Sequence, residues 1–101
     1  WLSLKNAMDM LLIAMTKTNS TDPIKVAKAL EGMKLQTFTG EVSMRADNHQ
    51  LLQPMYISTL TKAGTAGVKY DVERTGMGFR SEGRIEAKST AMPTTCKMQR
   101  P

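Results

Sequence analysis

The side chains of this sequence that could act as a base or a nucleophile are one histidine, His49, and one cysteine, Cys96. Histidine is the usual general base near neutral pH, and a thiolate is a strong nucleophile. However, no serine or cysteine stands in a recognisable nucleophile motif with His49, and Cys96 lies in a threonine-rich tail with no helix N-terminus to activate it. We therefore interpret His49 as a loop residue whose imidazole hydrogen-bonds the backbone. We predict no catalytic residue and expect that the protein is not an enzyme.

Other residue types could bind a metal or a cofactor. The sequence contains nine methionines, and thioethers are soft ligands that suit copper. Met8, Met10 and Met15 instead follow the spacing of a helix core, and the others are scattered, so packing is the better interpretation. Gly76-x-Gly78 lacks the helix and the third glycine of a dinucleotide-binding fingerprint. The carboxylates include no pair that local spacing forces together, and we predict no metal site and no cofactor.

Length and composition favour one small globular domain. The chain has 101 residues, of which 41% are hydrophobic and 23% charged. A chain of this length buries somewhat over ~60% of the surface that it exposes when unfolded. Its longest apolar run, residues 10–15, is shorter than the roughly 18 residues that a transmembrane helix needs. The single cysteine excludes a disulfide within this sequence and leaves open a pairing with a cysteine elsewhere in a longer protein.

The positive charge of the chain raises one alternative function. A net charge of +5 could indicate a basic nucleic-acid-binding module. The 14 Lys and Arg residues are instead spread from Lys5 to Arg100, with no cluster of the kind that marks a basic patch. A solvated basic surface is therefore the better interpretation, and we predict no nucleic-acid partner.

Residues 3–18 are predicted to form a helix. Apolar residues recur there at the spacing of one helical face, namely Leu4, Ala7, Met8, Leu11, Leu12 and Met15. Met10, Ile13 and Ala14 extend the apolar surface well beyond that face. The rest of the chain offers too little to cover such a helix on several sides while it also builds its own core. We therefore expect the missing cover to come from a larger protein or from a second copy of the chain.

A second helix is predicted over residues 23–32, with clear signals at both ends. Asp22 is a good N-cap, Pro23 fits the first helical position, and Gly32 can end the helix in a left-handed conformation. The predicted buried stripe consists of Ile24, Ala27 and Leu30 with Val26, and the residues predicted to face solvent are Lys25, Lys28 and Glu31. The polar linker over residues 18–21 is short, so the two helices should be antiparallel neighbours.

Short extended segments are predicted over residues 36–72. Thr39-Gly40 is a turn signal, and the alternation over residues 55–62 suits a half-buried strand that follows Pro54. Residues 68–72 alternate in the same way and predict another short strand. Large apolar residues are few over residues 73–101, where we expect a mostly irregular tail. The predicted fold class is therefore α/β, with two antiparallel helices followed by short strands and an irregular C-terminal tail.

Several stretches of the sequence, in this order, match a known pattern. They are Ser20-Thr21-Asp22-Pro23, residues 25–33, Gly40 and Val42, Met44-Arg45-Ala46, residues 49–56 and Pro93-Thr94-Thr95-Cys96-Lys97-Met98. Together they resemble the C-terminal part of ABC-transporter substrate-binding proteins of the branched-chain amino acid type, which have the type I periplasmic binding fold. The His-Gln-x-x-x-Pro-x-Tyr pattern that begins at His49 is the most specific part of this resemblance.

The resemblance implies a longer parent protein with two doubly wound α/β lobes joined at a hinge. An amino acid or a related small carboxylate would bind between the lobes, and the closed protein would dock onto an ABC permease. Residues 1–101 would form a single C-terminal fragment of this secreted, periplasmic receptor. The start of the sequence at Trp1, without an initiator methionine or a signal-peptide pattern, suggests the same interpretation.

The resemblance places one residue of this chain, Trp1, near the ligand, because the segment just before the first helix approaches the cleft in that family. The other ligand-binding residues of the family lie mostly upstream of Trp1. A sensory or self-associating ligand-binding domain is a further alternative, because the same fold serves extracellular sensors and the first helix has excess apolar surface. If the chain stands alone, a homodimer or an exchange of segments between copies should cover that surface.

Overall fold

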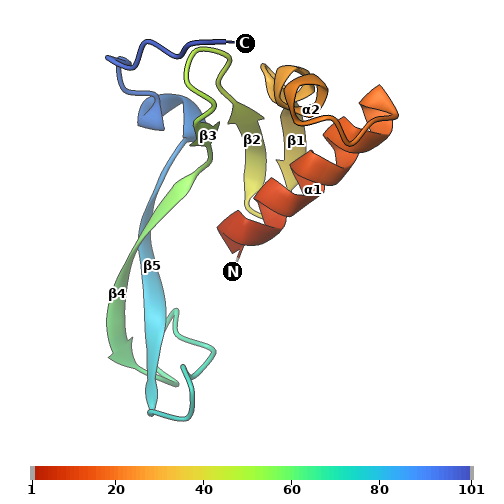
Figure 1. The fold of residues 1–101 in the computed structure, drawn as a ribbon. Helices are drawn as coiled ribbons and strands as arrows, with labels where there is room; N and C mark the ends of the chain where they lie inside the picture. The colour runs from red at the N-terminus through yellow and green to blue at the C-terminus, as the bar shows by residue number, and fades with distance from the viewer. Residues whose placement is uncertain (1, 101) are drawn as a thin grey trace. The chain divides into compact units, whose positions relative to one another are not determined.

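The computed structural model describes residues 2–100 and divides them into two compact units (Figure 1). The first unit consists of residues 2–54 together with 87–100, and the second consists of residues 55–86. The first unit contains both α-helices, a small sheet and a 3₁₀-helix, whereas the second is a two-stranded antiparallel ribbon. Among residues 2–100, no helix has both the length and the apolar character that a membrane span needs.

Two helices open the first unit, α1 (Leu2–Thr18) and α2 (Pro23–Leu30), and they pack against each other. The predicted capping signals of α2 are confirmed. The Asp22 side chain accepts a hydrogen bond from the Lys25 N–H at 2.9 Å, and Pro23 occupies the first turn. Gly32 has a φ of +72°, so the chain turns there in the left-handed conformation that glycine adopts without steric cost.

A three-stranded antiparallel sheet follows, with the order β1 (Lys34–Thr37), β2 (Gly40–Met44) and β3 (Leu51–Leu52). β1 and β2 form a tight hairpin in which Thr37 pairs with Gly40, as the turn signal predicts. The core of this unit is Met10, Ala14, Val26 and Val42. α1 and the sheet therefore share one small apolar core.

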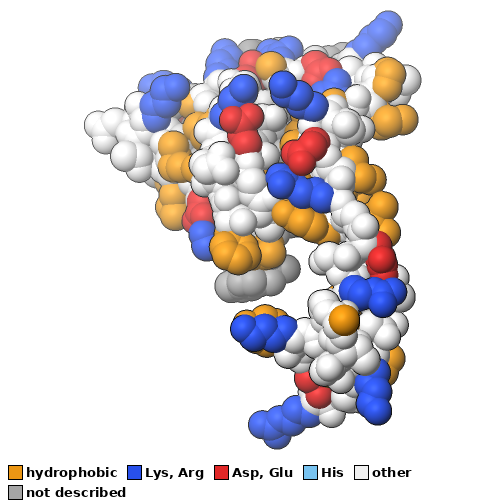
Figure 2. Space-filling view, turned by 180° about the vertical axis from the view of Figure 1, so that it is seen from behind, with side chains coloured by type: hydrophobic (Ala, Val, Ile, Leu, Met, Phe, Trp, Pro, Cys, Tyr) orange, Lys and Arg blue, Asp and Glu red, His pale blue; other side chains and the backbone are white. Residues whose placement is uncertain are grey.

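The buried face of α1 differs from the predicted one. The helix buries Asn6, Met10 and Ala14, while the predicted face stays at the surface, with Leu4 61%, Met8 50% and Leu12 56% exposed. The cause is topological, because α2 and the hairpin cover only the side of α1 that carries Met10. Figure 2 shows hydrophobic side chains at the surface between charged ones. The prediction that this helix has more apolar surface than its own chain covers is confirmed.

The stripe predicted for α2 also needs correction. Ile24 is exposed and Val26 is buried, while Ala27 and Leu30 are only partly covered. With eight residues, α2 has little more than two turns, so one well-placed side chain suffices to anchor it against α1.

The second unit contains β4 (Met55–Lys62) and β5 (Met77–Ile85), paired in antiparallel register with a bulge after Ile57. β4 was correctly predicted as a strand but not as a half-buried one, because its apolar side chains are exposed on both faces of the ribbon. The prediction of an irregular tail over residues 73–101 is partly wrong as well, because β5 lies within this range. The 3₁₀-helix η1 (Ala87–Thr90), which belongs to the first unit, also lies within it.

The loop over residues 63–76 replaces the predicted third strand. Val68 is buried there by packing against Gly78 of β5 rather than by strand pairing. A Cβ atom at Gly78 would lie 2.2 Å from the Tyr70 carbonyl oxygen and 2.5 Å from a methyl group of Val68. The glycines of β5 made this strand hard to predict from the sequence. Gly78 is required in the structure, because only a residue without a side chain lets the loop pack against the strand.

Candidate functional site

A carboxylate, an imidazole and a guanidinium that are far apart in the sequence meet at the end of α2, and we call Glu31, His49 and Arg100 the Glu31 clamp. One Glu31 carboxylate oxygen lies 3.2 Å from Nε2 of His49 and 2.8 Å from Nε of Arg100. Arg100 also donates a hydrogen bond to the Ala46 carbonyl. The expectation that the His49 imidazole bonds the backbone is therefore wrong, because it meets a carboxylate instead.

The electrostatics of the clamp favour the charged form of Glu31. The hydrogen bond from Arg100 lowers the pKa of Glu31 below its usual value, partial burial opposes this effect, and the hydrogen bond from His49 adds to it. A hollow of about 270 Å³ lies beside the clamp, lined on one side by Pro23, Ile24 and Ala27. Among residues 2–100, no serine or cysteine lines this hollow.

A second set of contacts holds the C-terminal segment to the loop before β3. Arg45 forms a two-point ion pair with Asp47, one bond of which is 2.8 Å, and donates to the Met92 carbonyl at 2.6 Å. The hydrogen bond between the Arg45 and Asp47 side chains lowers the pKa of Asp47 and raises the pKa of Arg45. Asn48 also reaches Thr94 at 3.3 Å. These contacts and the Glu31 clamp thus hold the C-terminal segment against α2 and the loop before β3.

Replacing Glu31 by glutamine should release this segment at neutral pH. The folded-state pKa of Glu31 lies below its unfolded value of about 4.5, so its contribution to stability is present above that pH and is lost as the pH falls through the folded value. Urea unfolding at pH 7 should therefore show wild-type more stable than E31Q, and the difference should shrink as the pH falls below the ordinary glutamate value of about 4.5.

Glu41→Gln is the matched control for that prediction, because Glu41 is an exposed glutamate whose 3.7 Å ion pair with Lys34 lies within the hairpin. Surface pairs of this kind contribute little. We expect E41Q to unfold like wild-type at pH 7. Equal stability of E31Q and E41Q at neutral pH would show that the clamp does not hold the C-terminal segment.

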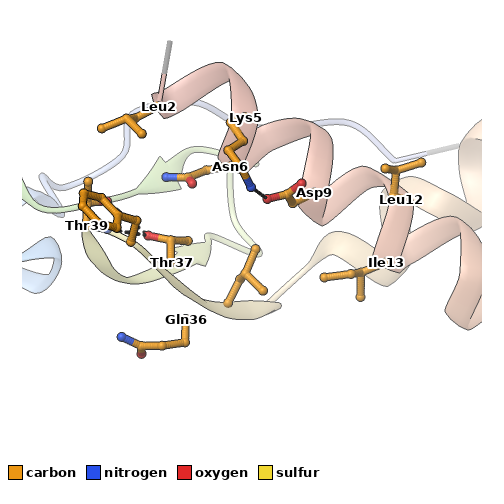
Figure 3. A pocket seen from close by; sticks show the side chains of 11 residues that line it. Leu2, Lys5, Asn6, Asp9, Leu12, Ile13, Gln36, Thr37 and Thr39 are labelled. Carbon is orange, nitrogen blue, oxygen red and sulfur yellow. Dashed lines mark hydrogen bonds and ion pairs between the residues drawn. The ribbon is translucent and has the colours of Figure 1, made fainter.

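A groove with a volume of about 440 Å³ lies between α1 and the β1–β2 hairpin, and both apolar and polar groups line it (Figure 3). We call it the α1–β1 groove. Its lining residues are Leu2, Lys5, Asn6, Asp9, Leu12, Ile13 and residues 35–39. Asn6 is only 4% exposed, and its amide nitrogen has no hydrogen-bond partner among the described residues. Lys5 and Asp9 form an ion pair with each other on the same stretch of α1.

The remaining candidates are Trp1, Cys96 and a metal or basic site. Trp1, the predicted ligand contact, lies outside the described residues. Cys96 is a free, exposed cysteine. Within residues 2–100, no group of three His, Cys, Asp or Glu side chains is arranged to hold a metal ion. Lys and Arg side chains are scattered over the face shown in Figure 2 and form no continuous stripe there.

Two features of these sites were missed from the sequence. Glu31 was expected to face solvent, and no local spacing links it to Arg100, which lies 69 positions away. Asn6 was overlooked, although a signal for it exists. It precedes Met10 and Ala14 by one and two steps of four residues, so a polar side chain occupies the first position of the face that α1 buries.

Comparisons with known proteins agree with this fold. A family model described as Periplasmic binding protein matches residues 2–65. Among solved structures, the chain is similar to the leucine-, isoleucine-, valine-, threonine- and alanine-binding protein from Brucella ovis in its closed conformation, with a TM-score of 0.78 and 23% sequence identity. That match covers 93% of this chain and 25% of the other chain, so this chain spans a quarter of the length of the protein it matches. A search of curated proteins finds no match.

The predicted resemblance and fold class are confirmed by two findings of different kinds. The family model matches more than half of the sequence, and the arrangement of the two helices and the antiparallel strands superimposes on a known binding protein over nearly the whole chain. The chain therefore belongs to the periplasmic binding protein family and has the fold of one part of a type I member.

Proposed function

We propose that this chain is the C-terminal part of a periplasmic receptor that binds an amino acid between two lobes and delivers it to an ABC permease. The similar solved structure is named for binding leucine, isoleucine, valine, threonine and alanine, which supports a branched-chain amino acid or a related small carboxylate as the ligand. In this proposal the longer protein, here called the parent, supplies most of the ligand contacts, and the chain supplies no catalytic group.

The observation that carries the proposal is the uncovered apolar stripe of α1, formed by Leu4, Met8 and Leu12. Each of these side chains is at least half exposed. Complete burial of a Leu or Met side chain contributes about 1.5–3 kcal/mol, so covering the stripe in a larger lobe would be strongly favourable. Contiguous exposed apolar surface of this kind marks a place where protein packs on protein.

The ribbon of β4 and β5 supports the same proposal. A single two-stranded ribbon is only marginally stable in water, because it has no second layer on which to bury its side chains. Ile57, Leu60 and Phe79 are each more than half exposed on this ribbon. We infer that the parent packs further structure against these strands.

The test is a thermal melt of the parent with and without L-leucine. Binding to the folded state alone stabilises by RT ln(1 + [L]/Kd), which is about 2.7 kcal/mol at a hundredfold excess over Kd. We expect L-leucine to raise the melting temperature and D-leucine, the matched control, to leave it unchanged. A parent that shows no shift with leucine, isoleucine, valine, threonine, alanine or phenylalanine at millimolar concentration would contradict the proposal.

Within this proposal, Trp1 is the residue of the chain that lies nearest the ligand. Trp1→Ala in the parent should then reduce the shift produced by L-leucine while the ligand-free melting temperature changes less. An unchanged leucine shift would remove Trp1 from the binding site and would leave the receptor proposal intact.

A further inference from the structure

The C-terminal segment, residues 91–100, adds little to the packing of the first unit. It forms neither helix nor strand, and only Thr94 and Met98 in it are partly buried. The core side chains of the first unit all lie outside it. Parts of a protein with few buried contacts open at a lower free energy than the whole molecule. The segment can therefore leave its place while the core stays packed.

Arg45 anchors the start of the segment. From the loop between β2 and β3, its side chain donates to the Met92 carbonyl at 2.6 Å, and two bonds to Asp47 fix its guanidinium. The Arg45 side chain is only 15% exposed. A cation in such a position is costly unless a neighbouring negative charge compensates it. The bond to Met92 therefore depends on the ionised form of Asp47.

Glu31 anchors the end of the segment. One of its carboxylate oxygens accepts from Arg100 at 2.8 Å and from His49 at 3.2 Å, and Arg100 also donates to the Ala46 carbonyl. Lys28 lines the hollow beside this clamp, and within residues 2–100 Glu31 is the only acidic residue that lines it. Protonation of Glu31 leaves Arg100 and Lys28 there as like charges, which repel each other. His49, when protonated, adds a third positive charge.

We propose that the C-terminal segment is an acid-released strap, which detaches from α2 and from the loop before β3 when Glu31 and Asp47 take up protons. The helices and the sheet of the first unit stay folded in this step. The end of the segment, residues 98–100, lines the hollow beside the Glu31 clamp, so its departure opens the hollow and exposes more of the apolar wall formed by Ile24 and Ala27. The segment is thus a cover whose position depends on pH.

The direction of the pH dependence follows from the two carboxylates. The hydrogen bond from its arginine partner lowers the pKa of each, for Glu31 below the ordinary 4.5 and for Asp47 below the ordinary 3.8. Such a carboxylate stabilises the folded contact above its ordinary pKa, and this contribution is lost as the pH falls through the folded value. The hydrogen bond between Asn48 and Thr94 has no titratable group. One neutral hydrogen bond contributes too little to keep the whole segment ordered.

A nitroxide spin label on Cys96 reports the strap directly. Cys96 is the single cysteine of the sequence, it is exposed, and it lies between the two anchored ends. Electron paramagnetic resonance spectra of the 101-residue chain should show restricted motion at pH 7. As the pH falls below the ordinary carboxyl values of 4.5 and 3.8, the mobile component should become dominant, while circular dichroism keeps the helix signal. A label that is already mobile at pH 7, or that stays restricted until the helix signal is lost, would overturn the proposal.

A pair of double variants separates the anchors from a general effect of charge. Glu31→Gln combined with Asp47→Asn should give a mobile label and an intact helix signal at pH 7. Asp9→Asn combined with Glu41→Gln is the matched control, because it removes two negative charges from surface ion pairs away from the segment, and its label should stay restricted. Equal label mobility in the two double variants would contradict the anchors, and loss of the helix signal in the first would contradict release of the segment alone. The strap uses side chains of this chain only, so these outcomes are independent of the receptor function.

Discussion

Replacing Met10 by alanine is expected to destabilise the 101-residue chain by about 2–5 kcal/mol, the usual cost of truncating a fully buried large aliphatic side chain. Met10 has no exposed surface and shares the small core with Ala14, Val26 and Val42. Few other buried side chains remain to compensate, and total stabilities of small domains are only about 5–15 kcal/mol. In urea unfolding followed by circular dichroism, most of the Met10→Ala protein should be unfolded at urea concentrations well below the midpoint of the wild-type transition.

Met8→Ala is the matched control, with the same substitution two positions away on the same helix. Met8 is half exposed, so its truncation should change the unfolding free energy by less than about 0.5 kcal/mol. Both variants must be compared at a concentration at which sedimentation shows a monomer, because a second copy could cover Met8. Similar losses at Met8 and Met10 would show that α1 is not packed on the face described.

Gly78→Ala is expected to detach the loop over residues 63–76 from β5. The added Cβ would lie 2.2 Å from the Tyr70 carbonyl oxygen, closer than any real contact, so backbone must move. Overpacking of this kind costs about 1–3 kcal/mol and more where backbone is the obstacle. The loss should appear as faster hydrogen exchange of the Val68 amide, which bonds the Thr65 carbonyl at 3.0 Å in the intact loop.

Gly83→Ala provides the control for that experiment on the same strand. A Cβ at Gly83 meets nothing within 4 Å, and its cross-strand partner is Ile57. The substitution should leave the Val68 amide protected and the chain as stable as wild-type. If Gly78→Ala also left the Val68 amide protected, the close approach of the loop to β5 would be wrong.

Much of the fold could be predicted because its signals are local. The cap at Asp22, the proline after it and the left-handed Gly32 fix α2 through bonds that span only a few residues. The turn at Thr39-Gly40 sets the register of the β1–β2 hairpin in the same way. The excess apolar surface of α1 was likewise visible from composition and spacing.

The remaining features depend on contacts that no local pattern contains. The periodicity of α1 marks an apolar face, but only the positions of α2 and the hairpin decide that Met10 rather than Met8 is buried. β5 could not be predicted because glycine is disfavoured in strands, and its glycines argue against one. Gly78 is needed there because the loop over residues 63–76 packs against it, a contact that the sequence does not reveal. The ion pair between Glu31 and Arg100 depends on the path of the C-terminal segment, and the spacing of residues along the sequence does not predict that path.

The central claim is that the uncovered stripe of α1 is an interior surface of the parent receptor. The most direct test is the unfolding free energy of Met8→Lys in the 101-residue chain and in the parent. We predict a change of less than about 0.5 kcal/mol in the chain, where the lysine stays in water, and a loss of about 3 kcal/mol or more in the parent, where an unpaired charge would be buried. The same small change in both proteins would contradict the account.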